Sequence, residues 1–113
     1  MAPQTALLLN QIEFELRQLQ LWSDTAPDSA ALASKLPFCC DTLTLQQWLQ
    51  FVFLPRMRAL IDAKQPLPTS LCICPIAEEA FAPISSEKLL LINKIADLDE
   101  LLSGKRVQQS ARV

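Results

Sequence analysis

Glycine is almost absent from this chain, whereas proline is common. Among 113 residues there is one glycine, Gly104, against eight prolines. Tight β-hairpin turns favour residues that adopt positive φ, and the chain contains no Asn-Gly or Asp-Gly pair. P-loops and Rossmann turns are excluded as well, because their backbones approach phosphate groups at several glycines. The sequence therefore predicts an all-α fold without these nucleotide-binding motifs.

Apolar residues recur at helical spacing in three long segments. They are 5–22, 44–64 and 86–103. The second opens with Thr44 and Gln47, which form the pattern of a capping box. It also contains Pro55, where we expect a kink because proline removes a backbone donor and clashes with the preceding turn. The predicted core positions are Leu8, Ile12, Leu16 and Leu19 in the first segment, Leu49, Val52, Met57 and Leu60 in the second, and Leu91, Ile95, Leu98 and Leu102 in the third.

The remaining chain consists of short, proline-rich connections. One of them contains a predicted short helix at 76–82, and residues 104–113 are expected to form a frayed tail. A chain of this length with 50% hydrophobic residues suits one domain. We therefore expect a single helical domain over 1–113. It is a bundle of three long helices, the central one kinked at Pro55, plus one or two short helices.

The charge distribution argues against several partners and locations. The net charge is −2 and the basic residues are scattered, so the basic stripe typical of proteins that bind nucleic acid directly is missing. A signal peptide has a basic region before its apolar residues, and the N-terminus of this chain lacks one. No apolar run approaches the roughly 20 residues that span a membrane. We expect a cytoplasmic protein that binds neither nucleic acid nor membrane.

Residues for common catalytic chemistries are missing. The chain has no histidine, which excludes a Ser-His or Cys-His nucleophile pair from this chain alone. The four cysteines form the pairs Cys39-Cys40 and Cys72-x-Cys74, whereas structural zinc sites favour two or more residues between paired ligands. We expect no enzyme activity and no cofactor, with the cysteines reduced, metal-free and packed under the connections.

A cluster of carboxylates lies in the third segment, at Asp97, Asp99 and Glu100. On a helix, residues two apart diverge by about 200°, so Asp97 and Asp99 cannot chelate one ion together. We interpret the cluster as a solvated face.

A second apolar row lies opposite the predicted core stripe of the first helix. It consists of Leu7, Phe14 and Leu21. A row with this seven-residue repeat resembles one seam of a coiled coil, and exposed apolar patches generally mark contacts. Alternatively, the connection over 30–40 folds back and covers it. The row is the candidate surface for a cytosolic partner protein or for self-association through the first helix.

The region of the expected kink is the candidate site for a small ligand or an anion. Arg56 and Arg58 follow Pro55, and Asp41 and Asp62 are the acids that could pair with them. A proline kink frees backbone carbonyl groups, so a polar pocket there is physically reasonable.

The string Trp48-Leu-Gln-Phe-Val-Phe-Leu-Pro-Arg-Met57, followed by Lys64-Gln-Pro-Leu-Pro68, resembles the YqcC-like family of uncharacterised small bacterial proteins. The resemblance extends from Trp22 to the last helix. It implies an all-helical bundle without assigned activity, whose motif does not include the cysteines. It also implies an association with a tRNA pseudouridine synthase, beside which such proteins are encoded in some genomes.

Two functions from different classes follow from these patterns. The first is an accessory module that docks on another cytosolic protein, such as an RNA-modifying enzyme. The second is a helical bundle that binds a small ligand or an anion near Pro55. A flat exposed apolar patch favours the first function, and a closed polar pocket favours the second.

Overall fold

The computed structural model describes residues 2–33, 42–104 and 108. Within these residues all regular structure is helical, as predicted. The elements in chain order are α1 (Ala2–Gln18), α2 (Ser29–Leu32), α3 (Leu45–Trp48), a π-helical segment (Leu49–Phe53), α4 (Leu54–Asp62), α5 (Cys74–Ala80) and α6 (Ser86–Ser103). Because α3, the π-helical segment and α4 follow one another without a break, the described part of the chain forms three long helical runs and two short helices.

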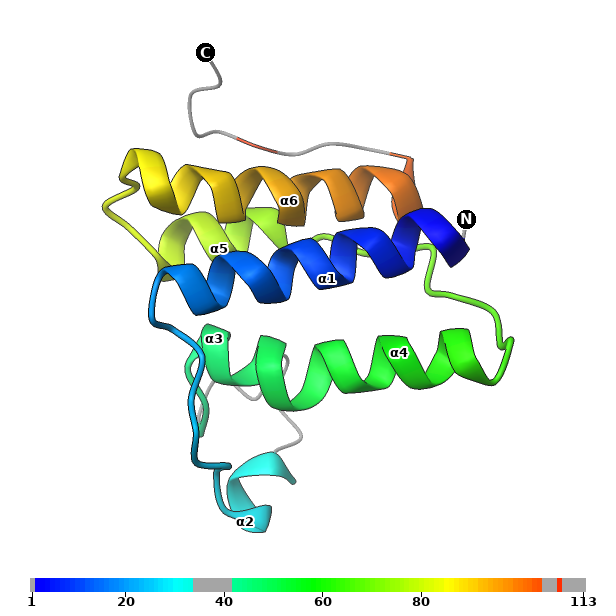
Figure 1. Ribbon diagram of the computed structural model, residues 1–113, viewed down its shortest axis with the longest axis horizontal. Coiled ribbons are helices and arrows are strands. Elements are labelled where there is room, and N and C mark those ends of the chain that lie inside the picture. The colour runs from blue at the N-terminus through cyan, green and yellow to red at the C-terminus, as the bar shows by residue number, and fades with distance from the viewer. Residues whose placement is uncertain (1, 34–41, 105–107, 109–113) are drawn as a thin grey trace.

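Helix α1 lies at the centre of this arrangement (Figure 1). It packs against α6 on one side, where the two helices run antiparallel, and against α4 on the other. Helix α5 packs on α6. The surface of α1 is therefore divided between two helix interfaces and an outer face.

The central run starts as predicted and becomes irregular just before Pro55. The Thr44 side chain accepts a hydrogen bond from the Gln47 backbone N–H, and the Gln47 side chain accepts one from the Thr44 N–H, which completes a capping box. Within the π-helical segment the Leu54 N–H donates to the Leu49 carbonyl, five residues back. Pro55 has no N–H to donate, so the wider turn accommodates the proline inside a continuous helical run.

The π-helical segment turns Gln50 inward, where it anchors the chain that follows α1. The Gln50 side chain accepts a hydrogen bond from the Ser23 N–H at 2.8 Å and donates one to the Ser23 carbonyl at 2.7 Å. Both polar atoms of the amide are thereby satisfied in a residue that is only 8% exposed. Gln50 belongs to the string that starts at Trp48, but the sequence pattern does not indicate this anchoring role.

The predicted core is confirmed in α6 and shifted in α1. All four predicted positions of α6 are buried. In α1 the buried stripe consists of Thr5, Leu9, Ile12 and Leu16. Leu8 and Leu19, which were also predicted as core positions, are half-buried and pack against the edge of the core. The stripe begins at a threonine, which a search for apolar periodicity passes over.

Helix α1 ends four residues earlier than expected. Gln20 has φ 61°, the Leu21 N–H donates to the Leu16 carbonyl, and the Gln20 N–H donates to the Arg17 carbonyl. These two bonds define a Schellman motif, which usually places glycine at the residue with positive φ. Because a glutamine stands where glycine is usual, the sequence pattern did not indicate that the helix ends here.

Candidate functional site

The outer face of α1 exposes two large apolar side chains. Leu7 and Phe14 are each 57% exposed, and Leu90 on α6 is 52% exposed. Leu21, predicted to continue the row, instead packs against the core because it lies beyond the end of α1. The row of three is thus corrected to two residues of α1, which Leu90 joins across the α1–α6 interface.

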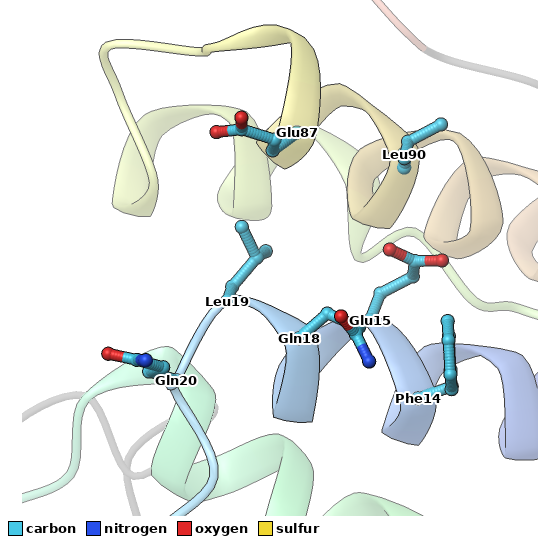
Figure 2. A pocket seen from close by; sticks show the side chains of 7 residues that line it. All are labelled: Phe14, Glu15, Gln18, Leu19, Gln20, Glu87 and Leu90. Atoms are coloured by element: carbon cyan, nitrogen blue, oxygen red, sulfur yellow. The ribbon is translucent and has the colours of Figure 1, made fainter.

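A pocket of about 490 Å³ opens between the C-terminal half of α1 and the N-terminal half of α6. Its lining residues are Phe14, Glu15, Gln18, Leu19, Gln20, Glu87 and Leu90. Figure 2 shows Glu15 of α1, and Leu19 just beyond the end of this helix, reaching toward α6, where Glu87 and Leu90 lie. The lining combines apolar surface with two carboxylates and two amides, and none of these seven residues is a lysine or an arginine.

A second pocket, of about 500 Å³, lies at the other end of the α1–α6 interface. It is lined by Gln4, Leu7, Leu8, Asp97, Glu100 and Leu101. Leu7 and Phe14 belong to the same stripe of α1, seven residues apart, and each lines one of the two pockets. We call the two pockets together the α1–α6 groove.

The opposite side of α1, which faces α4, is held by charged contacts. The Arg17 Nε donates to Glu13 Oε2 at 2.9 Å, and the Arg58 Nη2 of α4 lies 2.8 Å from Glu13 Oε1 and 3.1 Å from Asn10 Oδ1. Partial burial raises the pKa of Glu13, but the hydrogen bonds and charges of the two arginines outweigh it and hold the pKa below its usual value. The Arg17 guanidinium also stacks 4.4 Å from the Trp22 ring centre.

These contacts bear on the predicted anion site. Arg58 is partly buried and its guanidinium is engaged by α1, whereas Arg56 and Asp62 are exposed on α4. Asp41 lies outside the described residues. The groove is lined by other side chains, and the anion site near Pro55 stays a prediction.

Asp99 was wrongly interpreted as part of a solvated face. It is 1% exposed, and its Oδ2 accepts hydrogen bonds from the N–H groups of Ile73 at 2.9 Å and Cys74 at 2.8 Å. The carboxylate thus caps the N-terminus of α5, where the helix dipole favours negative charge. Its Oδ1 is buried and has no hydrogen-bond partner among the described residues. Burial raises the pKa of Asp99, against the lowering effect of the two backbone N–H groups.

The position of Asp99 along α6 indicates a buried role, but a search for apolar residues at helical spacing does not detect it. Asp99 follows Ile92 by seven residues and Ile95 by four, which places it on the buried stripe of α6. Asp97, in contrast, lies at the half-buried edge of the groove, and Glu100 is exposed there.

The described cysteines form no recognisable site. Cys74 is buried, whereas Cys72 is exposed, so the expectation that Cys72 packs under the connections was wrong. Cys39 and Cys40 lie outside the described residues. Among the residues that the structure describes, no three side chains suited to metal ligation come together, and no helix has the length and hydropathy to cross a membrane.

Comparisons with known proteins identify relatives along nearly the whole chain. A family model described as tRNA pseudouridine synthase C matches residues 4–101. An uncharacterised protein of Haemophilus influenzae is 39% identical over 104 residues, which cover 92% of this chain and 97% of that protein. The solution NMR structure of YqcC from Escherichia coli superposes with a TM-score of 0.79 at 32% identity, covering 98% of this chain and 95% of that one.

A further relative is longer. The tRNA pseudouridine synthase C of Pectobacterium carotovorum subsp. carotovorum is 42% identical over 71 residues, which are 63% of this chain and 19% of that protein. The uncharacterised protein YqcC of Escherichia coli is 36% identical over 97 residues, covering 86% of this chain and 89% of that protein. The family match over 4–101 and these relatives show that the chain belongs to the YqcC-like family, as the string around Trp48 predicted.

Proposed function

We propose that this protein is a noncatalytic accessory module of the cytosol that docks on a tRNA pseudouridine synthase through the α1–α6 groove. The observation that carries the proposal is the exposure of Leu7, Phe14 and Leu90 around this groove. Large apolar side chains that cluster on the surface of a small domain are typical of contact sites. Phe14 is the natural anchor, because aromatic residues supply much of the binding free energy of protein interfaces.

The identity of the partner is supported by the relatives. A sequence similar to 63% of this chain occurs within a protein named tRNA pseudouridine synthase C. Similarity of a separate small protein to part of a larger enzyme supports a functional association between the two. The exposed apolar surface then offers a physical basis for that association.

The test is direct binding between the purified chain and the tRNA pseudouridine synthase C of the same organism, measured by isothermal titration calorimetry. We expect Phe14→Asp to weaken binding by about 30-fold or more, as loss of an interface hot spot does. The matched control is Ala59→Asp, which places the same charge at an exposed position of α4 outside the groove. Circular dichroism would verify that both variants keep the helical fold.

Two results would overturn the proposal. One is the absence of binding by the wild-type chain at concentrations of up to about 100 μM, because most specific accessory contacts have dissociation constants below this value. The other is an unchanged affinity of the Phe14→Asp variant, which would place the contact elsewhere.

A further inference from the structure

We infer that the α1–α6 groove selects a basic amphipathic helix, one that presents apolar side chains flanked by lysine or arginine. This inference rests on the proposed function in taking the groove as a docking surface, and it goes further by assigning the chemistry of the occupant. It is carried by the charge of the lining and by the spacing of the exposed apolar residues.

The pocket at Phe14 is acidic as well as apolar. Glu15 of α1 and Glu87 of α6 line it, together with Gln18 and Gln20, and the Glu15 side chain reaches toward α6 (Figure 2). Within the described part of the chain, neither glutamate has an ion pair. Carboxylates beside apolar surface attract a cation more strongly than fully hydrated ones, because the effective dielectric constant is lower there. A lysine or arginine fits this lining, since its apolar stem can lie on Phe14 while its charged end meets the carboxylates.

The spacing of the groove suits a helix as the occupant. Leu7 and Phe14 are seven residues apart on α1, which corresponds to about 10 Å along the helix axis. A second helix lying along the groove places side chains at positions i, i+3 or i+4, and i+7 over the same length. Apolar residues at these positions can therefore contact both pockets from one face, with basic residues reaching the glutamates from its flank.

The same acidic lining disfavours two other occupants. A second copy of this chain, docked groove to groove, brings Glu15 and Glu87 against the same glutamates, and like charges at an interface are costly. A nucleic acid brings phosphates to the carboxylates, where no cation of the lining compensates them. The complementary occupant is a positively charged polypeptide segment.

The first experiment uses two defined peptides, so that it does not depend on the synthase. One is a 14-residue helix of leucine and lysine with leucine at i, i+3, i+4 and i+7, and the other carries glutamate in place of each lysine. Binding is followed by chemical shift changes in the ¹⁵N spectrum of the full chain. We expect the lysine peptide to shift the amides of Glu15, Gln18, Glu87 and Leu90, with an affinity that falls as salt rises. The glutamate peptide should bind at least about tenfold more weakly.

Charge reversal of the groove provides the specific control. In the double variant Glu15→Lys/Glu87→Lys the preference should reverse, so that the glutamate peptide binds and the lysine peptide does not. The matched variant Glu79→Lys changes an exposed glutamate of α5 that does not line the groove, and it should retain the wild-type preference. The thermal melting of each variant shows whether it remains folded.

The second experiment separates this inference from the proposed function. Binding of the synthase by the wild-type chain, with the same affinity and salt dependence in Glu15→Gln/Glu87→Gln, would leave the proposed function standing and overturn the basic occupant. Failure of the synthase to bind, together with a peptide preference that reverses as expected, would overturn the partner and support the groove chemistry.

Other results would assign the groove differently and overturn the inference. They are equal binding of both peptides, shifts that map away from the groove, and a dimer of the wild-type chain in sedimentation that Phe14→Asp abolishes. A deletion of residues 105–113 that by itself shifts the amides of the groove would also overturn it, because the chain's own C-terminal segment would then be the occupant.

Discussion

Two pairs of carboxylates in this bundle have opposite surroundings. Glu13 is bound by two arginines, and Asp99 accepts hydrogen bonds from two backbone N–H groups at the start of α5. Glu15 and Glu87 line the groove without an ion pair within the described residues. Glu13 and Glu15 are only two residues apart on α1, so they diverge by about 200° and face different neighbours. The first pair connects elements of the fold, whereas the second pair is available for the recognition that we propose.

The largest loss of stability among these carboxylates is expected for Asp99→Ala. The substitution leaves the N–H groups of Ile73 and Cys74 without their acceptor in a buried place. Hydrogen bonds to charged groups contribute about 1.5–3 kcal/mol, so we expect the free energy of unfolding to fall by roughly that amount. Urea denaturation followed by circular dichroism measures it. Asp99→Asn keeps one acceptor oxygen and should lose less, whereas an alanine variant as stable as wild type would contradict the capping role.

A smaller loss is expected for Glu13→Gln at neutral pH. The carboxylate is 23% exposed and its partner Arg58 is 37% exposed, so solvent screens the pair. Pairs of this kind contribute about 0.5–1 kcal/mol to stability. The variant should unfold at a slightly lower urea concentration with an unchanged slope. A matched substitution on the same helix, Glu15→Gln, serves as the control that should show no such loss.

The two engaged carboxylates should also differ in the direction of their pH dependence. The pKa of Glu13 is lowered by the arginines in the folded chain, so its stabilising effect is present above the unfolded pKa and is lost as pH falls through the folded pKa. The pKa of Asp99 is raised, chiefly by burial, so its contribution is greatest below the unfolded pKa and declines as pH rises through the folded pKa.

The measurement is the stability of wild type relative to each amide variant between about pH 3 and pH 7, the range in which carboxyl groups of this kind titrate. The difference for Glu13→Gln should grow with pH, and the difference for Asp99→Asn should shrink. Parallel slopes for the two variants would show that the surroundings of these carboxylates do not differ as the structure indicates.

Much of the fold could be predicted, and the reasons differ between elements. Helix α6 matches the predicted range 86–103, because its apolar period is uninterrupted, Ser85 caps its start and Gly104 at φ 77° ends it. The end of α1 could not be predicted, because Gln20 adopts positive φ where the pattern gives no glycine. Lys64, with φ 55°, ends the central run in the same way.

The candidate site could be predicted only in part. The seven-residue repeat identified Leu7 and Phe14, since this relation is local to one helix. The groove depends on the packing of α1 against α6, which places Glu15 and Glu87 in the lining of one pocket although they are far apart in the sequence. No spacing rule within one segment could reveal that pair. Asp99 was missed for a related reason, because its partners, the N–H groups of Ile73 and Cys74, belong to another element.

The smallest effect on stability should come from Glu15→Gln together with Glu87→Gln. Neither carboxylate has an ion pair within the described residues, and glutamine has nearly the same shape and helix propensity as glutamate. We expect the free energy of unfolding to change by no more than about 0.5 kcal/mol, as for surface substitutions that remove no specific contact. Urea denaturation at pH 7 provides the measurement, with Glu13→Gln as the comparison in which a contact is lost. A loss as large as that of Glu13→Gln would mean that the groove carboxylates also hold the fold together. The division between carboxylates that stabilise the bundle and carboxylates that face a partner would then be wrong.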